Sequence, residues 1–492
     1  MTGEGRKRES VCAGPKKDGM NFMKKENDSK KELELYFHIP FCVRKCFYCD
    51  FLSAPGDEET KRSYMESLLT ETVGSALRYG EYRVTSVFIG GGTPSVIPPV
   101  LIAGLMEAVR KNYDLAQDAE VTMEGNPGTL SGEALALYRE AGINRLSIGL
   151  QSADDRELAA IGRIHTWQQF LETFREARQA GFSNINVDIM SALPGQTLSG
   201  YRHTLEKVLA LENPPEHISA YSLILEEGTP FYERYKRGEL ELPDEDTDRE
   251  MYQETKHILE SHGYKRYEIS NYAKKGYECR HNCGYWQRKN YVGFGIGAAS
   301  LVENVRFRNE ANLKAYLGNP LGCKKEVQVL SRQEQMEEFM FLGLRMTEGV
   351  DLQRFERLFG CRMEEIYGEV IRKNLRDGLL RYLPGDAGKS QSEVREHSGS
   401  SCRDLPSDGG KFPAGDRDTA GEIPGKANGG KEALSVGGKA DGDKEALPVG
   451  GKADGGKEAL SVGGKAPGDS LRLALTDRGL DLSNYVMAQF LG

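Results

Sequence analysis

Between about residues 33 and 226, short apolar β-branched runs alternate with amphipathic segments, and this alternation limits the fold more than any other feature. The apolar runs predict strands over 33–40, 84–91, 119–124, 145–150, 184–190 and 217–224. The segments between them predict helices over 59–79, 98–112, 130–141, 166–180 and 199–211. Such repeats form parallel sheets with right-handed crossovers. We therefore expect an α/β protein with a partial (β/α)6 barrel, and a doubly wound sheet is the alternative.

Three cysteines follow the first predicted strand directly. Cys42, Cys46 and Cys49 have the spacing CxxxCxxC. Three thiolates can hold three corners of a [4Fe-4S] cluster and leave the fourth iron open, whereas a structural cluster takes four thiolates. The molecule that commonly fills the open position is S-adenosylmethionine (SAM), which chelates iron through its amino and carboxylate groups. One-electron reduction then splits SAM to a 5′-deoxyadenosyl radical, so the cofactor supplies the difficult chemistry.

Other uses of these cysteines fit less well. A zinc site needs four nitrogen or sulfur ligands, and no second close Cys or His pair follows. His38 is a candidate fourth ligand, but the Pro-Phe pair between it and Cys42 suits a strand leaving a sheet. A disulfide framework is disfavoured because 9 cysteines in 492 residues are sparse and odd in number. Free thiols and a thiolate-held cluster both indicate a reducing, cytoplasmic setting.

A glycine-rich segment, Gly90-Gly-Gly-Thr-Pro-Ser95, ends the second predicted strand. Glycines allow the backbone to approach a ligand without interference from a Cβ atom. We expect Gly91, Gly92 and Thr93 to contact a ligand, and a tight turn before the next helix is the alternative.

Polar residues stand at or near the ends of the later strands. Glu124 closes the third strand, Gln151 ends the fourth, and Asp188 lies within the fifth. An unpaired buried charge is very costly, so Asp188 needs a partner. Arg163 can supply a pair with Asp188 or with a ligand carboxylate. Active sites of such barrels lie at the C-terminal ends of the strands, where the cysteines also stand.

Taken together, these motifs resemble the radical-SAM superfamily. Over about residues 33–384 and 470–492, the chain is similar to the family of oxygen-independent coproporphyrinogen III oxidase and its HemW-type haem-chaperone relatives. The resemblance implies SAM-facing or cluster-facing positions at Tyr36, Tyr48, Gly91, Gly92, Thr93, Glu124, Gln151, Arg163, Asp188, Ser222 and Ala299. It leaves open whether one SAM or two bind.

Two features separate these relatives. The oxidase has CxxxCxxCxC, but here Phe51 occupies the last place. The chain also carries His281-Asn-Cys-Gly-Tyr-Trp286, which matches the HNxxYW motif of the HemW-type proteins. An imidazole can ligate haem iron, and Tyr and Trp can pack on a porphyrin face. A buried histidine in aromatic core packing is the alternative.

The resemblance therefore implies a haem chaperone that binds haem, the cluster and SAM, and delivers haem to acceptor haemoproteins such as respiratory enzymes. Any membrane contact would be peripheral, because no run of 18 apolar residues occurs. The net charge of −9 gives no electrostatic case for nucleic-acid binding. The alternatives are oxidative decarboxylation of coproporphyrinogen III and radical chemistry on another substrate.

Four regions are expected along the chain: a disordered tail over 1–32, the barrel over 33–230, its completion with the HNxxYW segment over 231–325, and a winged-helix-like module over 326–492. The module combines helices near 334–346, 351–359 and 363–376 with strands near 377–382 and 470–479. Residues 385–469 are low in apolar side chains and repeat Lys-Glu-Ala-Leu at 431, 444 and 457. We expect this insertion to be disordered and to leave from the tip of the wing.

Overall fold

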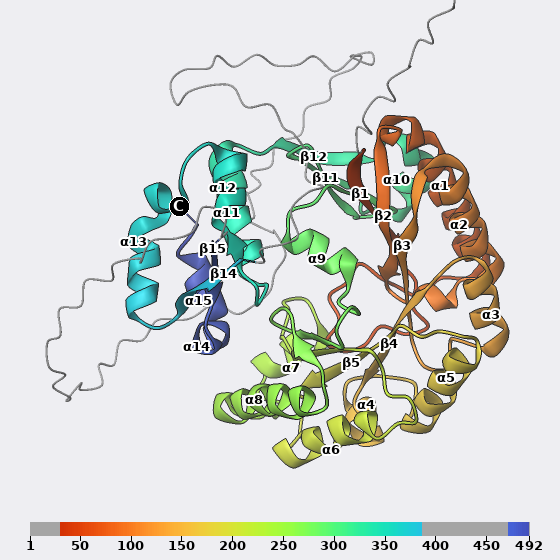
Figure 1. The fold of residues 1–492 in the computed structure, drawn as a ribbon. Coiled ribbons are helices and arrows are strands. Elements are labelled where there is room, and N and C mark those ends of the chain that lie inside the picture. The colour runs from red at the N-terminus through yellow and green to blue at the C-terminus, as the bar shows by residue number, and fades with distance from the viewer. Residues whose placement is uncertain (1–29, 386–470, 492) are drawn as a thin grey trace, which may run out of the picture.

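The computed structural model describes residues 30–385 and 471–491 of the 492-residue chain. Its main element is a 12-stranded sheet in the order β12-β11-β10-β9-β1-β2-β3-β4-β5-β6-β8-β7. A separate three-stranded sheet has the order β13-β15-β14. Figure 1 shows the large sheet curving inside an outer ring of helices, with the small sheet in a second body beside it.

Six parallel strands form the centre of the large sheet. They are β1 (Lys31–Ile39), β2 (Tyr82–Gly91), β3 (Asp114–Gly125), β4 (Arg145–Gln151), β5 (Ile185–Ser191) and β6 (His217–Ser222). Each pairs with the next in sequence order. A doubly wound sheet would reverse its order at a switch point, so that alternative is wrong. Because β9 lies beside β1 and β8 beside β6, the six strands form an open, partial barrel.

The predicted strands are confirmed with small shifts at their ends. The largest shift is in β3, which begins at Asp114 rather than near residue 119. Its first residues pair with β2 before a register shift, after which Ser86 pairs with Glu120. The polar residues at this irregularity interrupt the apolar pattern. For this reason the prediction from the sequence began the strand too late.

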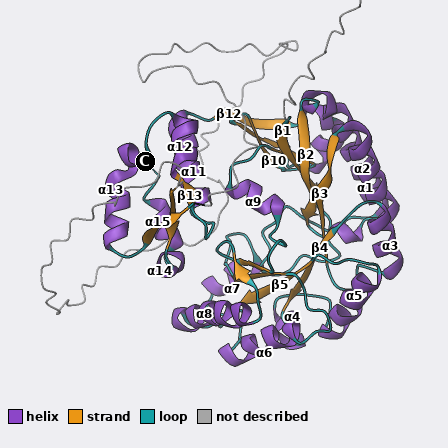
Figure 2. Ribbon diagram, viewed as in Figure 1, coloured by secondary structure: helices purple, strands orange, loops and turns teal. Residues whose placement is uncertain are grey.

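Helices follow the strands and cover the outer face of the sheet, as Figure 2 shows in purple. They are α1 (Glu58–Ser75), α2 (Pro99–Asn112), α3 (Gly132–Glu140), α4 (Asp155–Ala160), α5 (Trp167–Gln179) and α6 (Leu198–Leu209). The six-residue α4 was not predicted, because it is too short to show a helical period. Side-chain caps mark most of the helix starts; Thr166 and Gln169, for example, form a reciprocal capping box at α5.

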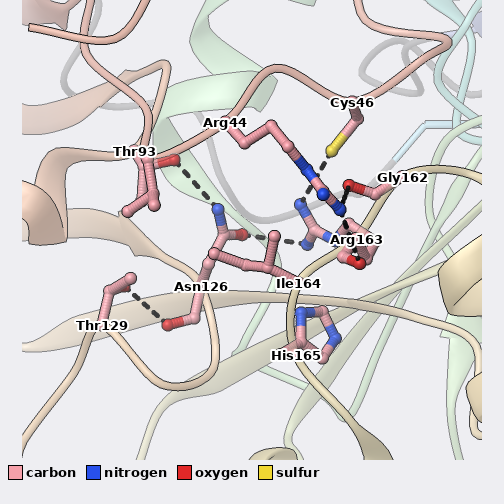
Figure 3. Close-up of a pocket in the computed structure, with 10 residues that line it drawn as sticks. Arg44, Cys46, Thr93, Asn126, Thr129, Gly162, Arg163, Ile164 and His165 are labelled. Atoms are coloured by element: carbon pink, nitrogen blue, oxygen red, sulfur yellow. Dashed lines mark hydrogen bonds between the residues drawn. The ribbon is translucent and has the colours of Figure 1, made fainter.

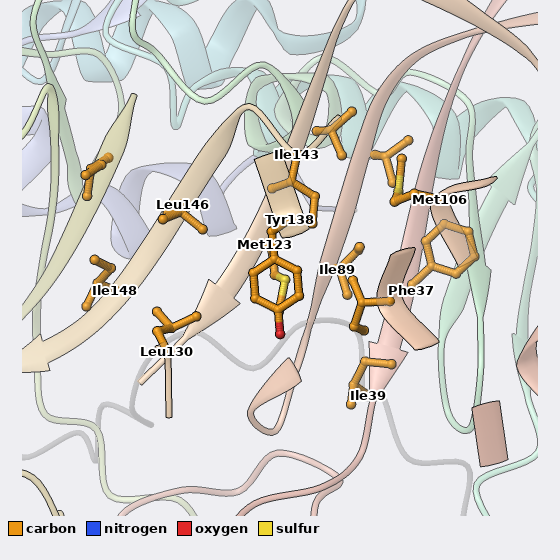
Figure 4. Close-up of a cluster of buried hydrophobic side chains, with 14 of the residues drawn as sticks. Phe37, Ile39, Ile89, Met106, Met123, Leu130, Tyr138, Ile143, Leu146 and Ile148 are labelled. Atoms are coloured by element: carbon orange, nitrogen blue, oxygen red, sulfur yellow. The ribbon is translucent and has the colours of Figure 1, made fainter. Parts of the chain in front are cut away.

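Alternation along the strands separates an apolar face from a polar one. Leu35, Phe37 and Ile39 of β1 are buried in the core between sheet and helices, and Figure 4 shows this layer continuing through Leu146 of β4. The intervening Glu34 and the residues at every second position after it belong to the opposite face, as the period of two requires. The barrel interior is therefore lined with polar groups.

The chain then closes the two edges of the barrel. The elements are α7 (Pro230–Lys236), α8 (Glu245–Ser261), β7 (Lys265–Arg266), β8 (Asn271–Ala273), α9 (Arg280–Trp286), β9 (Tyr291–Phe294), β10 (Ala299–Val302), β11 (Val305–Asn309), α10 (Leu313–Gly318) and β12 (Lys324–Val329). β8 runs antiparallel to β6, and β9 runs parallel to β1. The helix between them, α9, therefore crosses from one edge of the barrel to the other.

The C-terminal body contains α11 (Arg332–Gly343), β13 (Val350–Asp351), α12 (Leu352–Phe359), α13 (Met363–Arg376), β14 (Leu380–Pro384), β15 (Leu471–Leu475), α14 (Asp477–Asp481) and α15 (Ser483–Ala488). β14 and β15 pair antiparallel, with Pro384 opposite Leu471. β14 and β15, the strands on either side of the insertion, are therefore neighbours in the small sheet. The insertion and nearly all of the predicted N-terminal tail lie outside the described residues. In the described part of the chain, every helix is too short or too polar to span a lipid bilayer.

We expect the substitution Leu146→Ala in β4 to lower the free energy of unfolding by about 2–5 kcal/mol, because it leaves a cavity in a close-packed layer. Leu146 is fully buried in the main core. Urea unfolding followed by circular dichroism measures the change. As a control, Leu77→Ala should change the free energy by less than about 0.5 kcal/mol, because Leu77 is 97% exposed. Equal effects of the two substitutions would contradict this description of the core.

Candidate functional site

The three cysteines lie on a loop that leaves β1 at the C-terminal end of the parallel strands. Two backbone hydrogen bonds close this loop, from Cys42 N to Ala54 O at 3.2 Å and from Ala54 N to Pro40 O at 2.9 Å. We call residues 40–54 the cysteine loop. Cys42, Cys46 and Cys49 are half-buried free thiols within it. The loop stands where (β/α) barrels carry their active sites.

Contacts from distant parts of the chain hold the cysteine loop in place. Phe47 donates its backbone N–H to Ile161 O at 3.1 Å and accepts one from Phe231 at 3.0 Å. The Arg44 guanidinium donates to Gly162 O at 2.9 Å. The cysteines are therefore presented on a fixed backbone.

The thiols of this loop fit an iron–sulfur cluster. Burial raises the pKa of Cys49 to about 11, nearby Lys45 opposes that shift, and the charges of Cys46 and Cys42 add to it. Among the described residues, no three His, Cys, Asp or Glu side chains converge closely enough for a single metal ion. A [4Fe-4S] cluster binds each of its thiolates at a separate iron, so these three cysteines would hold three of its irons.

The glycine-rich segment packs its backbone directly against the cysteine loop. Gly92 N donates to Ile39 O and Thr93 N to Phe41 O, both at 2.8 Å. A Cβ atom on Gly92 would lie 2.7 Å from Phe41 O and 3.0 Å from Cys42 Sγ. Gly91 has φ = +114°, a conformation that a side chain would strain. The glycines are thus required by the contact between the two loops; their contact with SAM stays a prediction.

Glu124 lies at the end of β3 beside this segment. Its Oε2 accepts the backbone N–H of Gly91 at 3.1 Å. Burial raises the pKa of Glu124 to about 8, Asp188 adds to the rise, and the Gly91 hydrogen bond opposes it. A carboxyl group in this state gains stability from a cation placed next to it. The amino group of a ligand would be such a cation.

Arg163 reaches from a loop after α4 into the space between the loops, as Figure 3 shows. Its Nη2 donates to Asn126 Oδ1 at 2.9 Å and to Gly149 O, and its Nη1 lies 3.8 Å from Cys46 Sγ. None of the ion pairs in the described part of the chain joins Arg163 to Asp188. Asp188 instead accepts from Asn186 Nδ2 at 2.7 Å. The direct pair considered from the sequence is therefore not formed, because each side chain has nearer partners.

The other predicted positions are placed around the same end of the barrel. The Tyr36 hydroxyl is 3.0 Å from His38 Nδ1. Burial raises the pKa of Tyr48, and the positive charge of Arg163 opposes that rise. Gln151, at φ = +75°, accepts from the Tyr221 hydroxyl at 3.1 Å.

Two predicted positions lie at the rim. Ser222 ends β6 and donates to Asp248 Oδ1 at 2.6 Å. Ala299 opens β10, just after the turn that follows the C-terminal end of β9. Because β9 runs parallel to β1, this turn stands at the same end of the barrel as the cysteine loop.

Two further residues, neither of them assigned to the cluster or to SAM from the sequence, connect the parts of the site. His38 Nε2 contacts Leu52 O at 2.9 Å and so ties β1 to the cysteine loop. With Tyr36 at its other nitrogen, His38 is not free to act as the zinc ligand considered above. Asn126 Nδ2 donates to Thr93 Oγ1 at 2.9 Å and joins that residue to Arg163. The sequence signal that could have identified Asn126 as a site residue is its position just beyond the end of the third strand, two residues after Glu124.

The HNxxYW segment forms α9 and buries His281 against the inner face of the barrel strands. His281 is 1% exposed, and its ring stacks on Phe88 with centroids 5.1 Å apart. Its Nδ1 is 2.8 Å from Ser86 Oγ, and its Nε2 is 2.9 Å from the Tyr285 hydroxyl. Both ring nitrogens are therefore occupied within the protein, as the buried-histidine alternative expects. Haem ligation by His281 stays a prediction.

Strand register separates α9 from the cysteine loop. His281 Nδ1 is 3.9 Å from Glu34 Oε2, and its backbone N–H donates to Glu120 Oε1 at 3.2 Å. Glu34, Ser86 and Glu120 are paired neighbours on β1, β2 and β3. His38 lies four residues further along β1, or about 13 Å of strand. We call the layer of Glu34, Ser86 and Glu120 the barrel floor, and the structure places His281 there.

A chain of hydrogen bonds nevertheless connects the two ends of the barrel. Asn186, whose Nδ2 donates to Asp188, accepts a hydrogen bond at its Oδ1 from His217 Nδ1 at 2.6 Å. His217 Nε2 is 2.8 Å from the Tyr267 hydroxyl, which also accepts the backbone N–H of Cys279 at 3.2 Å. Cys279 is the residue at which α9 begins. Asp188 is thus linked to α9 through buried polar groups.

The far end of α9 contacts the C-terminal body. The Arg345 guanidinium stacks over the Trp286 ring at 4.2 Å. Arg354 donates to Gln287 O at 3.0 Å, and Arg288 pairs with Glu338 at 2.8 Å. Figure 1 shows α9 between the sheet and this body. The motif therefore joins the barrel floor to the C-terminal helices.

Comparisons with known proteins decide the family. Residues 36–208 match the radical SAM superfamily, and residues 330–382 match the HemN C-terminal domain. "Heme chaperone HemW" of Lactococcus lactis is 39% identical over 352 residues, covering 71% of this chain and 91% of the relative. The chain belongs to the HemW family of radical-SAM proteins. The HemW of Bacillus subtilis is 38% identical, and the match covers 92% of that relative. The mouse "Radical S-adenosyl methionine domain-containing protein 1, mitochondrial" is 36% identical, and the match covers 86% of it.

A solved structure shows the same fold. Coproporphyrinogen III oxidase (HemN) from Escherichia coli, a radical SAM enzyme, superimposes with a TM-score of 0.63 at 22% identity. The match covers 71% of this chain and 85% of the oxidase. The HemW-type chain therefore shares its architecture with the oxidase, in agreement with the fold expected from the sequence.

The buried imidazole of α9 leads to a prediction on pH. Burial lowers the pKa of His281 from 6.5 to about 3, and Arg145 contributes to the shift. Below pH 6.5 the unfolded chain binds a proton at this residue that the folded chain does not bind. The stability from the neutral imidazole is therefore complete above pH 6.5 and falls as the pH drops toward about 3.

Between pH 7 and pH 5, His281→Gln should lose about 2 kcal/mol less of its free energy of unfolding than the parent protein. Urea unfolding at the two pH values measures this difference. His262→Gln, at an exposed histidine, serves as the control and should follow the parent. Identical pH responses of His281→Gln and the parent would show that this imidazole is not held neutral by burial.

Proposed function

We propose that this protein is a haem chaperone, which holds a [4Fe-4S] cluster and SAM at the C-terminal end of the barrel and delivers haem to acceptor haemoproteins. The observation that carries the proposal is its similarity to the bacterial proteins named as haem chaperones, which it covers over about nine-tenths of their length. Phe51 supports it, because this exposed side chain occupies the place of the fourth cysteine in the oxidase motif.

In this proposal Cys42, Cys46 and Cys49 hold three irons of the cluster. SAM would fill the open coordination positions of the fourth iron. When bound, the cluster and SAM would supply one-electron chemistry. The chain's own residues bind and orient SAM. The residues proposed for this role are Tyr36, Tyr48, Gly91, Gly92, Thr93, Glu124, Gln151, Arg163, Asp188, Ser222 and Ala299.

Charge supports the proposed orientation of SAM. The Glu124 carboxyl, with its raised pKa, suits the amino group of SAM, whose positive charge would favour the ionised carboxylate. The half-buried Arg163 guanidinium suits the SAM carboxylate, because it already lies beside Cys46. These two groups would fix opposite ends of the amino-acid part of SAM.

Haem binding is proposed to involve the HNxxYW segment. A neutral imidazole is the form that ligates iron, and burial keeps His281 neutral. Coordination through Nε2 requires that nitrogen to leave the Tyr285 hydroxyl. Haem binding at α9 would therefore involve movement of this helix, which also contacts the C-terminal body.

The remaining parts of the proposal concern location and organisation. A thiolate-held cluster suits a reducing compartment, so we place the protein in the cytoplasm, with respiratory haem enzymes as acceptors. We also propose 33–230 as the barrel, 231–325 as its completion and 326–492 as the C-terminal module. The described chain supports this division by its contacts, since the C-terminal helices have a hydrophobic core of their own.

Two anaerobic assays on the reconstituted protein test the chaperone function. Added haem should give a Soret band that saturates with haem concentration, and the band should weaken in His281→Ala relative to the exposed-residue control His262→Ala. Coproporphyrinogen III with SAM and reductant should give no protoporphyrinogen, because Phe51 replaces the fourth cysteine.

The outcomes of these assays are distinct. Decarboxylated product would establish the oxidase activity instead and overturn the chaperone proposal. A Soret titration unchanged in His281→Ala would remove His281 as the haem ligand while leaving haem binding intact. Circular dichroism and iron content of each variant show whether it has folded and kept its cluster.

A further inference from the structure

A continuous set of polar contacts connects two of the proposed cluster cysteines through one amide side chain. Thr93 Oγ1 lies 3.5 Å from Cys42 Sγ, and Arg163 Nη1 lies 3.8 Å from Cys46 Sγ. Asn126 joins these two donors, with Nδ2 at 2.9 Å from Thr93 Oγ1 and Oδ1 at 2.9 Å from Arg163 Nη2. Figure 3 shows the amide between the two side chains.

The chemistry of the partners fixes the direction of each hydrogen bond. A guanidinium only donates, so the amide oxygen of Asn126 must face Arg163. The amide nitrogen then faces Thr93 and donates to its hydroxyl oxygen. Because that hydroxyl accepts from Asn126, its own proton is free to point toward the Cys42 sulfur. One amide therefore contacts both donors, and Gly149 O accepts a second hydrogen bond from Arg163 Nη2.

Backbone contacts hold Asn126 itself in place. Its carbonyl oxygen accepts from Thr129 N at 3.1 Å and from Thr129 Oγ1 at 2.7 Å. Pro127 follows it, and a residue before proline is restricted to extended conformations. The amide is thus presented from a constrained turn at the end of β3. Of the common side chains of this size, only an amide combines the required donor and acceptor.

We propose that Asn126 is a positioning residue that directs the Thr93 hydroxyl to Cys42 and the Arg163 guanidinium to Cys46, and thereby sets the reduction potential of the cluster. The inference rests on the proposed cluster at these cysteines. Hydrogen bonds and positive charge at thiolate sulfurs stabilise the electron-rich reduced cluster. Both donors therefore raise the potential, and their loss lowers it.

A redox titration of the full-length, anaerobically reconstituted protein tests this inference. The reduced cluster is followed by electron paramagnetic resonance in the absence of SAM. Asn126→Ala should shift the midpoint potential to a more negative value than the parent. Asn126→Asp, which has nearly the same shape, should also shift it negatively, because a carboxylate cannot donate to Thr93 and adds negative charge. Asn112→Ala, at an exposed asparagine that ends α2, should leave the potential unchanged.

A second pair of variants separates positioning from a general structural role. Thr93→Val removes the hydroxyl and should lower the potential, whereas Thr93→Ser should restore it. Combining Thr93→Val with Asn126→Ala should shift the potential by less than the sum of the single shifts, because Asn126 acts on Cys42 through Thr93. Additive shifts would contradict this route.

The outcomes distinguish this inference from the proposed function. Asn126→Ala and Asn126→Asp proteins with full iron content and the parent potential would overturn the role of Asn126. If Asn126→Ala fails to retain iron, the near-isosteric Asp variant decides the question. A parent protein that binds no cluster would instead refute the proposed cofactor, and a missing Soret response with an intact cluster would refute the haem function alone.

Discussion

The site depends on the parallel pairing of β1 with β2, which continues beyond both strands into the two loops. Gly92 and Thr93 donate their backbone N–H groups to Ile39 and Phe41, each at 2.8 Å. These bonds place the glycine-rich segment against the cysteine loop, and the missing Cβ atoms make so close a contact sterically allowed. Every other feature of the site, from the Glu124 carboxyl to the Asn126 amide, is arranged around this junction.

The barrel interior carries polar groups at both of its ends. At one end they surround the cysteine loop, and at the other they receive α9 and its HNxxYW motif. Buried side chains, among them Asn186 and His217, connect these ends by hydrogen bonds. Because α9 also contacts the C-terminal body through Trp286, the proposed SAM site and that body share one continuous set of contacts.

Local sequence predicted the parts of the fold that local forces determine. β-Branched runs marked all six barrel strands, and the spacing of three cysteines marked the loop after the first. The position of His281 was not predictable, because its partner Ser86 lies 195 residues away and the strands around α9 are short. Asn126 was missed for a related reason, since its role arises from Thr93 and Arg163, which meet only in the folded chain. Motifs therefore identified the chemistry, whereas strand register decided which motifs lie together.

The central claim is that the three thiolates of the cysteine loop leave one iron without a protein ligand. Mössbauer spectra of protein reconstituted with ⁵⁷Fe, recorded with and without SAM, examine that iron directly. The account predicts that SAM changes the isomer shift and quadrupole splitting of one iron in four, while the other three stay the same. Spectra in which all four irons are unaffected by saturating SAM would contradict it.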